Sequence, residues 1–139
     1  MTLKPLGEQG FSLVELLISI TILSIGLFAV ATMQTVAISN TAVSNRMMTA
    51  TDLANQAMED ILCWDPANAA LNASAADVAY ANGVQVTGGG TFNITYKTAI
   101  NTPAIGTTRI DITVTELTGG SGTNGPISPV TITGFRKVV

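Results

Sequence analysis

The chain has no histidine and a single cysteine among its 139 residues. Histidine is the commonest general base and transition-metal ligand in proteins. A catalytic site or a transition-metal site in this chain would therefore have to use other residues. The lone Cys63 cannot form an intramolecular disulfide, and we interpret it as a small apolar residue at a helix end. The sequence also lacks a Gly-Lys-Ser phosphate loop and a Gly-x-Ser-x-Gly nucleophile turn. We therefore expect no enzyme activity, no catalytic residues, no metal site and no cofactor.

Charge is also scarce, because charged residues make up 11% of the chain, against about 25% in typical soluble domains. The net charge is −3, and the 6 basic residues are scattered along the sequence. Nucleic-acid-binding proteins gather positive charge on one face. Apart from the adjacent Arg136 and Lys137, the sequence shows no such cluster. We therefore do not expect nucleic acid as a partner.

Hydrophobic residues make up 47% of the chain, and the excess lies mostly in residues 11–38. That run contains one charge, Glu15, and no proline. About 20 apolar residues suffice to span a bilayer as a helix. A secretory signal has a shorter apolar region that ends at a small-residue cleavage site, which this run lacks. We expect residues 11–38 to form a single membrane-spanning helix.

Glu15 is unusual within this apolar run. A charged side chain costs about 2.5–3.5 kcal/mol at the bilayer centre on insertion scales, and less near the interface. A simple signal anchor explains the length of the run but does not explain Glu15. If the chain were cut between Gly10 and Phe11, Phe11 would gain a free α-amino group about one helical turn from Glu15. The amine and the carboxylate could then pair within one chain or between neighbours.

The sequence GFSLVE at residues 10–15, followed by the long apolar segment, resembles the prepilin peptidase motif of type IV pilins and type II secretion pseudopilins. The resemblance implies cleavage after Gly10, N-methylation of Phe11 and a role for Glu15 in assembly. It implies prepilin peptidase, an inner-membrane assembly platform and other pilin subunits in a helical filament as partners. The leader departs from the family's basic pattern, because Glu8 accompanies its single lysine, Lys4.

The helical pattern continues beyond residue 38 with one apolar stripe, which is typical of an amphipathic helix. Its members recur at spacings of three and four: Ala50, Leu53, Ala54, Ala57, Met58, Ile61 and Leu62. Asp65-Pro66 is expected to end the helix, because proline disfavours helical backbone at the residue before it. A continuous helix from Phe11 to about Leu62 would be roughly 75–80 Å long.

The C-terminal half shows the alternation of half-buried antiparallel strands. Apolar and polar residues alternate in four segments, at residues 84–86, 92–97, 109–115 and 130–133. We interpret residues 65–82 as a loop with room for a short helical turn, residues 88–90 and 101–106 as turns, and residues 118–129 as a mobile hairpin loop. Asp77 and Asp111 are interpreted as surface charges.

These patterns predict an α+β protein, and the arrangement agrees with the pilin fold that the resemblance implies. A long N-terminal helix, transmembrane in its first half, packs on a small antiparallel sheet of about three or four strands. We expect four segments: a leader at residues 1–10, a transmembrane and assembly helix at 11–38, its amphipathic continuation at 39–64, and a loop with the sheet domain at 65–139.

A finer resemblance concerns the last strands. TRIDITVTEL, then PVTITGFRKVV after a loop, together with residues 53–59, looks like a PilV-type minor pilin. It implies a pilus subunit with a role in adhesion or motility, held in the bacterial inner membrane as a single-pass protein before it joins a surface pilus. Two alternatives remain open: a type II secretion pseudopilin in a periplasmic pseudopilus, and a membrane-anchored binding domain that does not assemble.

Overall fold

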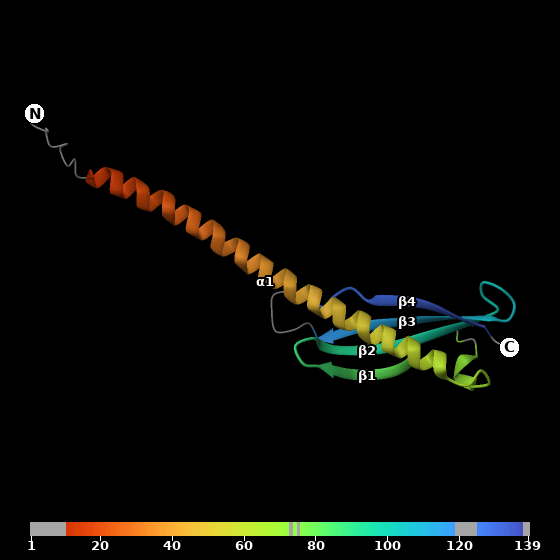
Figure 1. The fold of residues 1–139 in the computed structure, drawn as a ribbon. Helices are drawn as coiled ribbons and strands as arrows, with labels where there is room; N and C mark the ends of the chain where they lie inside the picture. Colours follow the sequence, from red (N-terminus) through yellow and green to blue (C-terminus); the bar gives the residue numbers. More distant parts are fainter. Residues whose placement is uncertain (1–10, 73, 75, 119–124, 138–139) are drawn as a thin grey trace, which may run out of the picture. The chain divides into compact units, whose positions relative to one another are not determined.

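The computed structural model describes residues 11–72, 74, 76–118 and 125–137. The elements follow in the order α1 (Leu13–Cys63), the short 3-10 helix η1 (Ala69–Leu71), and strands β1 (Val78–Val86), β2 (Gly90–Ile100), β3 (Thr107–Thr118) and β4 (Val130–Lys137). The strands form one antiparallel sheet in the order β1-β2-β3-β4 (Figure 1). The prediction of a long helix and a small antiparallel sheet is confirmed, with four strands.

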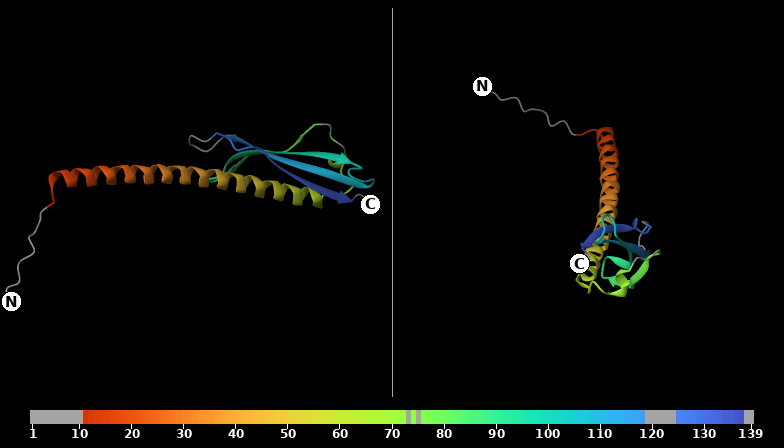
Figure 2. Two further views of the ribbon diagram at one scale, coloured as in Figure 1. Left: turned by 90° about the horizontal axis from the view of Figure 1, so that it is seen from above. Right: turned by 90° about the vertical axis from the view of Figure 1, so that its right-hand side faces the viewer.

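The chain divides into two compact units, residues 1–38 and residues 39–139. Helix α1 contributes to both, because it runs through the boundary without a break. It ends at Cys63, just before Asp65-Pro66, as predicted. Within the second unit, the helix covers one face of the sheet and leaves the other face uncovered (Figure 2).

The sheet confirms the predicted alternation. Phe92, Ile94 and Tyr96 of β2 are buried, and so are Ile110, Ile112 and Val114 of β3. The register between these strands pairs Ile94 with Val114 and Tyr96 with Ile112, so buried residues lie opposite one another. Because side chains alternate between faces along a strand, the residues between them form the outer face of the sheet. One apolar face is thus turned to α1.

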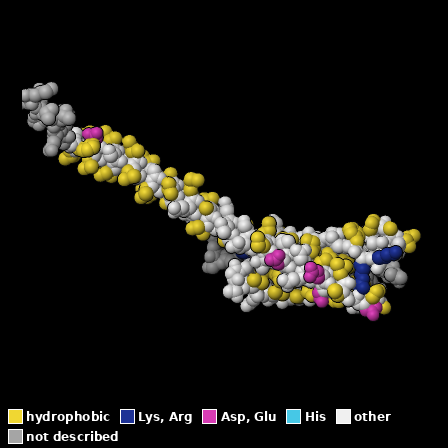
Figure 3. All heavy atoms as spheres, viewed as in Figure 1, with side chains coloured by type: hydrophobic (Ala, Val, Ile, Leu, Met, Phe, Trp, Pro, Cys, Tyr) yellow, Lys and Arg dark blue, Asp and Glu magenta, His cyan; other side chains and the backbone are white. Residues whose placement is uncertain are grey.

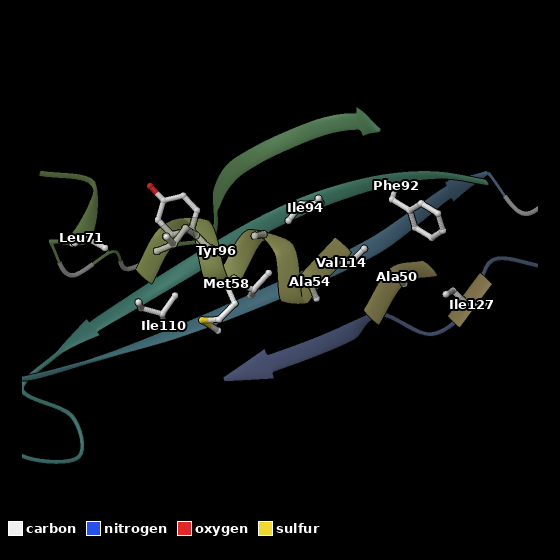
Figure 4. Packing of buried hydrophobic residues seen from close by; sticks show 13 residues of the cluster. Ala50, Ala54, Met58, Leu71, Phe92, Ile94, Tyr96, Ile110, Val114 and Ile127 are labelled. Atoms are coloured by element: carbon white, nitrogen blue, oxygen red, sulfur yellow. The ribbon is translucent and has the colours of Figure 1, made fainter. Parts of the chain in front are cut away.

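The helix side of this core is built from small residues. Ala50, Ala54 and Ala57 are fully buried against the sheet, together with Ile61. Alanine has the strongest helix propensity and no bulky side chain, so it allows the helix backbone to approach the strands closely. Met58 fills the remaining space near β4, and the larger side chains come from the sheet (Figure 4).

Close packing also explains a glycine in β4. A Cβ atom added to Gly134 would lie 2.5 Å from the Met58 sulfur. Such a contact is shorter than any normal van der Waals distance, so Met58 can occupy its place only because residue 134 has no side chain.

The loop predicted for residues 65–82 is wrong at its C-terminal end, because β1 begins at Val78. Residues 78–82 combine Val78 and Tyr80, which favour strands, with two alanines and an asparagine, which do not. They become a strand because β2 supplies the partner, and their weak preference shows in two register shifts between Ala79 and Val84. The expected short helical turn is present as η1, and the Asn68 side chain caps it by accepting a hydrogen bond from the Ala70 amide.

Both predicted short turns are confirmed. At residues 88–90 the Gly89 amide donates to the Val86 carbonyl at 2.9 Å and closes the β1–β2 hairpin. At residues 101–106, Asn101 and Gly106 have φ values of 57° and 80°, and the Asn101 side chain accepts a hydrogen bond from the Gly106 amide. The predicted loop at residues 118–129 falls partly on residues 119–124, which lie outside the described residues.

Candidate processing and assembly site

The predicted cleavage point lies next to the start of the helix. Helix α1 begins at Leu13, and the carbonyl of Ser12 accepts the hydrogen bond of the Leu16 amide at 3.1 Å. Phe11 precedes the helix and is 83% exposed. The predicted processing residue Gly10 lies outside the described residues. Phe11 therefore marks the point at which the apolar chain enters the helix.

Glu15 is the acidic residue of the first helical turn. With Ser12 before the helix, it completes the Ser-x-x-Glu spacing of a capping box, in which the glutamate reaches back toward the first backbone amides. The helix dipole also favours a negative charge at this end. Across the described part of the chain, the Glu15 carboxylate has no hydrogen-bond or ion-pair partner, since only its backbone carbonyl accepts a bond, from Ser19 at 2.8 Å.

Five hydroxyl side chains in the apolar helical segment form hydrogen bonds with their own helix backbone. Hydroxyl groups donate to carbonyls three or four residues earlier in the same helix, at 2.7–3.1 Å; the donors are Ser19, Thr21, Ser24, Thr32 and Thr35. Such back-bonding removes most of the penalty of placing a hydroxyl in an apolar environment. A carboxylate cannot donate in this way, so Glu15 differs from these residues in requiring a partner.

The surface of this segment is apolar on all sides. Its large hydrophobic side chains are between 51% and 83% exposed, and Phe11, Ile25 and Phe28 are among the most exposed. By length and composition alone, the helix contains a stretch that could cross a membrane, with a mean hydropathy of 2.4 over its most apolar window. A helix that is hydrophobic all round must be covered by lipid or by other protein. Figure 3 shows hydrophobic side chains along the whole of this segment and one acidic group near its start.

A buried ion pair in the second unit was missed by the sequence analysis. The Arg46 guanidinium lies 3.2 Å from the Glu116 carboxylate, and their side chains are 6% and 0% exposed. Glu116 also accepts a hydrogen bond from the Ile127 amide at 2.8 Å, and Arg46 donates to the Gly125 carbonyl at 3.4 Å. The pair thus joins α1, the end of β3 and residues 125–127.

This pair corrects the picture of residues 118–129 as a simple connecting loop. Their described end is anchored, because Ile127 is buried and its amide is bound to Glu116. An ion pair that loses one partner leaves a buried charge uncompensated, which is strongly unfavourable. No spacing in the sequence links Arg46 to Glu116, since they are 70 positions apart.

Three other sequence interpretations also need adjustment. Cys63 lies at the helix end as expected, but it is exposed and not packed as an apolar residue. Asp111 is not a free surface charge, because it pairs with Arg109 at 3.0 Å and accepts a hydrogen bond from Thr133 at 2.8 Å. Asp77 is exposed, as expected.

The pKa of the Tyr80 hydroxyl, which lies near the end of α1, is raised by its surroundings. The hydroxyl of Tyr80 donates to the Asp60 carboxylate at 2.7 Å. This hydrogen bond, helped by partial burial and by the nearby negative charge, raises the pKa of Tyr80 above its usual value of 10.0. Trp64 stacks on Tyr80 with ring centroids 6.4 Å apart and meets Tyr96 edge-on at 5.8 Å. The cluster stabilises the turn from the helix to the sheet.

A family model described as the prokaryotic N-terminal methylation motif matches residues 6–31. The match supports the type IV pilin and pseudopilin family, and it covers the predicted cleavage bond, Phe11 and Glu15. No curated protein and no solved structure matches the chain. In the described part of the chain, no group of three or more cysteine and acidic side chains is placed to hold a metal ion.

Proposed function

We propose that this chain is a structural subunit of a type IV pilus, a minor pilin, cut after Gly10, N-methylated at Phe11 and assembled through its N-terminal helix. One observation carries the proposal: the methylation motif over residues 6–31 leads directly into a helix that is apolar on every side. Prepilin peptidase would remove residues 1–10. The mature chain would stay in the inner membrane through residues 11–38 until other pilin subunits replace the lipid.

Cleavage provides the partner that Glu15 otherwise lacks among the described residues. Hydrolysis of the Gly10–Phe11 bond leaves a carboxylate on the released leader and a charged amine on Phe11, and a methylated amine keeps that charge. An isolated charge in an apolar environment is strongly unfavourable, so amine and carboxylate stabilise each other when they meet. If the amine of one copy pairs with the Glu15 carboxylate of a neighbouring copy, the two groups can meet only at one axial offset between the two helices. Glu15 would then set the register of assembly.

The decisive test of processing is mass spectrometry of the N-terminus of the protein recovered from membranes. We expect a chain that begins with N-methylated Phe11. The variant Gly10→Val should keep the leader, because the bulky side chain obstructs the peptidase. A native chain that retains Met1, or one cut near Ala31, would contradict the proposal.

The role of Glu15 is tested by the variant Glu15→Ala. We expect it to stay membrane-bound, because the helix becomes more apolar, but to enter filaments at least tenfold less efficiently. Two matched controls sharpen the result: Glu15→Asp keeps the charge and should retain much of the incorporation, and Ser19→Ala removes only a hydroxyl bonded to its own helix. Normal incorporation of Glu15→Ala would rule out the register role.

The methylation motif is shared by pilins and pseudopilins, so a pseudopilin of type II secretion is the second candidate. Labelling intact cells for the full-length chain separates the two. A minor pilin is expected on extended surface fibres, whereas a pseudopilin is confined to the envelope. A membrane-anchored domain that does not assemble would show neither fibres nor cross-links between copies.

A further inference from the structure

In the described part of residues 39–139, α1 carries exposed acidic side chains, whereas most charges on the outer face of the sheet are basic: Lys97 and Arg109 are partly exposed and Lys137 is exposed. The outward side of α1 carries Asp52 and Glu59, both exposed. They are seven residues apart, about two helical turns or about 10 Å, so they lie on the same side of the helix. No lysine or arginine occurs between Arg46 and Lys97 in the sequence. This acidic stripe, Asp52 and Glu59, is therefore not neutralised by its own helix.

The outer face of the sheet carries the opposite charge. The even-numbered residues are buried toward α1 between residues 92 and 98 of β2 and between residues 108 and 116 of β3, so Lys97 and Arg109 point to the outer face. On β4, Lys137 is exposed and alternates with the half-buried Arg136. The register places Lys97 opposite Asp111, Ala99 opposite Arg109, and Thr107 opposite Lys137. Lys97, Arg109 and Lys137 thus gather at one end of the outer face and form a basic patch.

The remaining charges leave this patch positive. Asp111 is the acidic residue that β2, β3 and β4 place on the outer face, and it pairs with Arg109. Arg46 is buried against Glu116, and Arg136 turns to the helix side, where it reaches the Ile61 carbonyl at 3.5 Å. Three cations and one anion share the patch. Figure 3 views the unit from the helix side and shows acidic side chains along the helix.

We propose that the basic patch of one copy docks on the acidic stripe of a second copy. The helix and the outer sheet face lie on opposite sides of the unit (Figure 2), so the two charges cannot meet within one chain. A contact between two different faces is heterologous, and it repeats from copy to copy into a closed ring or, where the rotation does not close, into an open helical array such as a filament. Complementary charge of this kind sets orientation and speeds association more than it adds affinity. The inference deepens the proposed filament role. It rests on that role only because assembly into a filament brings neighbouring copies together.

Charge reversal tests the pairing in full-length chains that carry two different tags in the same cells. The variant Lys97→Glu with Lys137→Glu leaves the Arg109–Asp111 pair intact, and Asp52→Lys with Glu59→Lys reverses the stripe. We expect each double variant alone to lower co-purification of the two tagged copies from membranes at least threefold. Combining them, one in each copy, should restore it. Asp77→Lys, which reverses an exposed acid outside the stripe, should change little.

Cross-linking locates the contact. One copy carries Gln56→Cys, between the two acids on the exposed side of α1, and the other carries Thr133→Cys, opposite Asp111 on the outer face. Both copies also carry Cys63→Ser, so that the only thiols are the introduced ones. We expect a disulfide-linked pair of the two tagged chains. Asn82→Cys on β1, in place of Thr133→Cys, should give a much weaker product.

Any of three results would overturn the inference. The first is no recovery of co-purification when the two reversals are combined, and the second is equal cross-linking through Asn82→Cys. The third is that Lys97→Glu with Lys137→Glu abolishes binding to a single-stranded oligonucleotide probe but leaves cross-linking unchanged. The last would assign the patch to nucleic acid. The two proposals fail separately. An uncut N-terminus with specific cross-links would refute only the pilin function, whereas a methylated, filament-bound chain that ignores the charge swap would refute only the docking contact.

Discussion

Residues 13–38 and residues 39–63 belong to one helix, yet they have opposite surroundings. The first segment buries none of its side chains, although most of them are apolar. The second buries six residues, including three alanines and an arginine, against the sheet. The helix runs through both segments without a break. The difference teaches that the second segment obtains its cover from the chain itself, whereas the first must obtain it from lipid or from other subunits.

The largest difference in stability between the two segments is expected when one partner of the buried Arg46–Glu116 ion pair is removed. Arg46→Ala should lower the free energy of unfolding of the 39–139 unit by about 3–5 kcal/mol, because Glu116 is left charged and buried. Urea unfolding of the full chain in detergent measures it. The paired replacement Arg46→Met with Glu116→Leu should recover most of the loss. Glu15→Ala, which changes a charge in the other segment, should leave this transition unchanged.

Deleting apolar atoms should affect only the covered segment. Ile112→Ala opens a cavity in the sheet core, and we expect a loss of about 2–5 kcal/mol in the same unfolding measurement. Leu23→Ala removes a similar side chain that is 67% exposed. It should not move the transition of the 39–139 unit. Equal effects of the two substitutions would show that the two segments are not separately stabilised.

Two glycines provide a matched pair across the boundary. A Cβ at Gly26 would meet nothing within 4 Å, whereas a Cβ at Gly134 would meet the Met58 sulfur. Gly134→Ala should destabilise the 39–139 unit by about 1–3 kcal/mol, toward the lower end because Met58 is flexible. Gly26→Ala should favour the helix by about 1 kcal/mol. Circular dichroism during urea unfolding reports both, and a rise in stability with Gly134→Ala would contradict the packing.

The smallest effect concerns pH. The hydrogen bond to Asp60 raises the pKa of Tyr80 in the folded state, so folding favours the protonated phenol. Its contribution is fully present below the unfolded pKa of about 10 and is lost as the pH rises through the folded pKa. Unfolding free energies at about pH 8 and about pH 11 should differ less in Tyr80→Phe than in the native chain. An unchanged difference would show that the bond does not contribute.

Periodicity predicted most of the secondary structure, because burial on one face imposes period two on a strand and about 3.6 on a helix. This is why the residues of β2 and β3 and the alanine stripe of α1 were found in the sequence. The start of β1 at Val78 was missed, because alanines and an asparagine interrupt the strand preference of Val78 and Tyr80, and pairing with β2 completes the strand. The roles predicted for Gly10, Phe11 and Glu15 remain predictions.

The sequence by itself determined the apolar segment, the position of Glu15 in it and the alternation that makes a one-sided sheet, because each depends on neighbours along the chain. Only the tertiary structure decided that Arg46 meets Glu116, that Gly134 leaves room for Met58, and that Lys97, Arg109 and Lys137 share one face. Those pairings join residues far apart in the sequence, and their partners are set by strand register and by how closely the helix lies on the sheet. The local sequence pattern does not specify the strand register or the distance between the helix and the sheet.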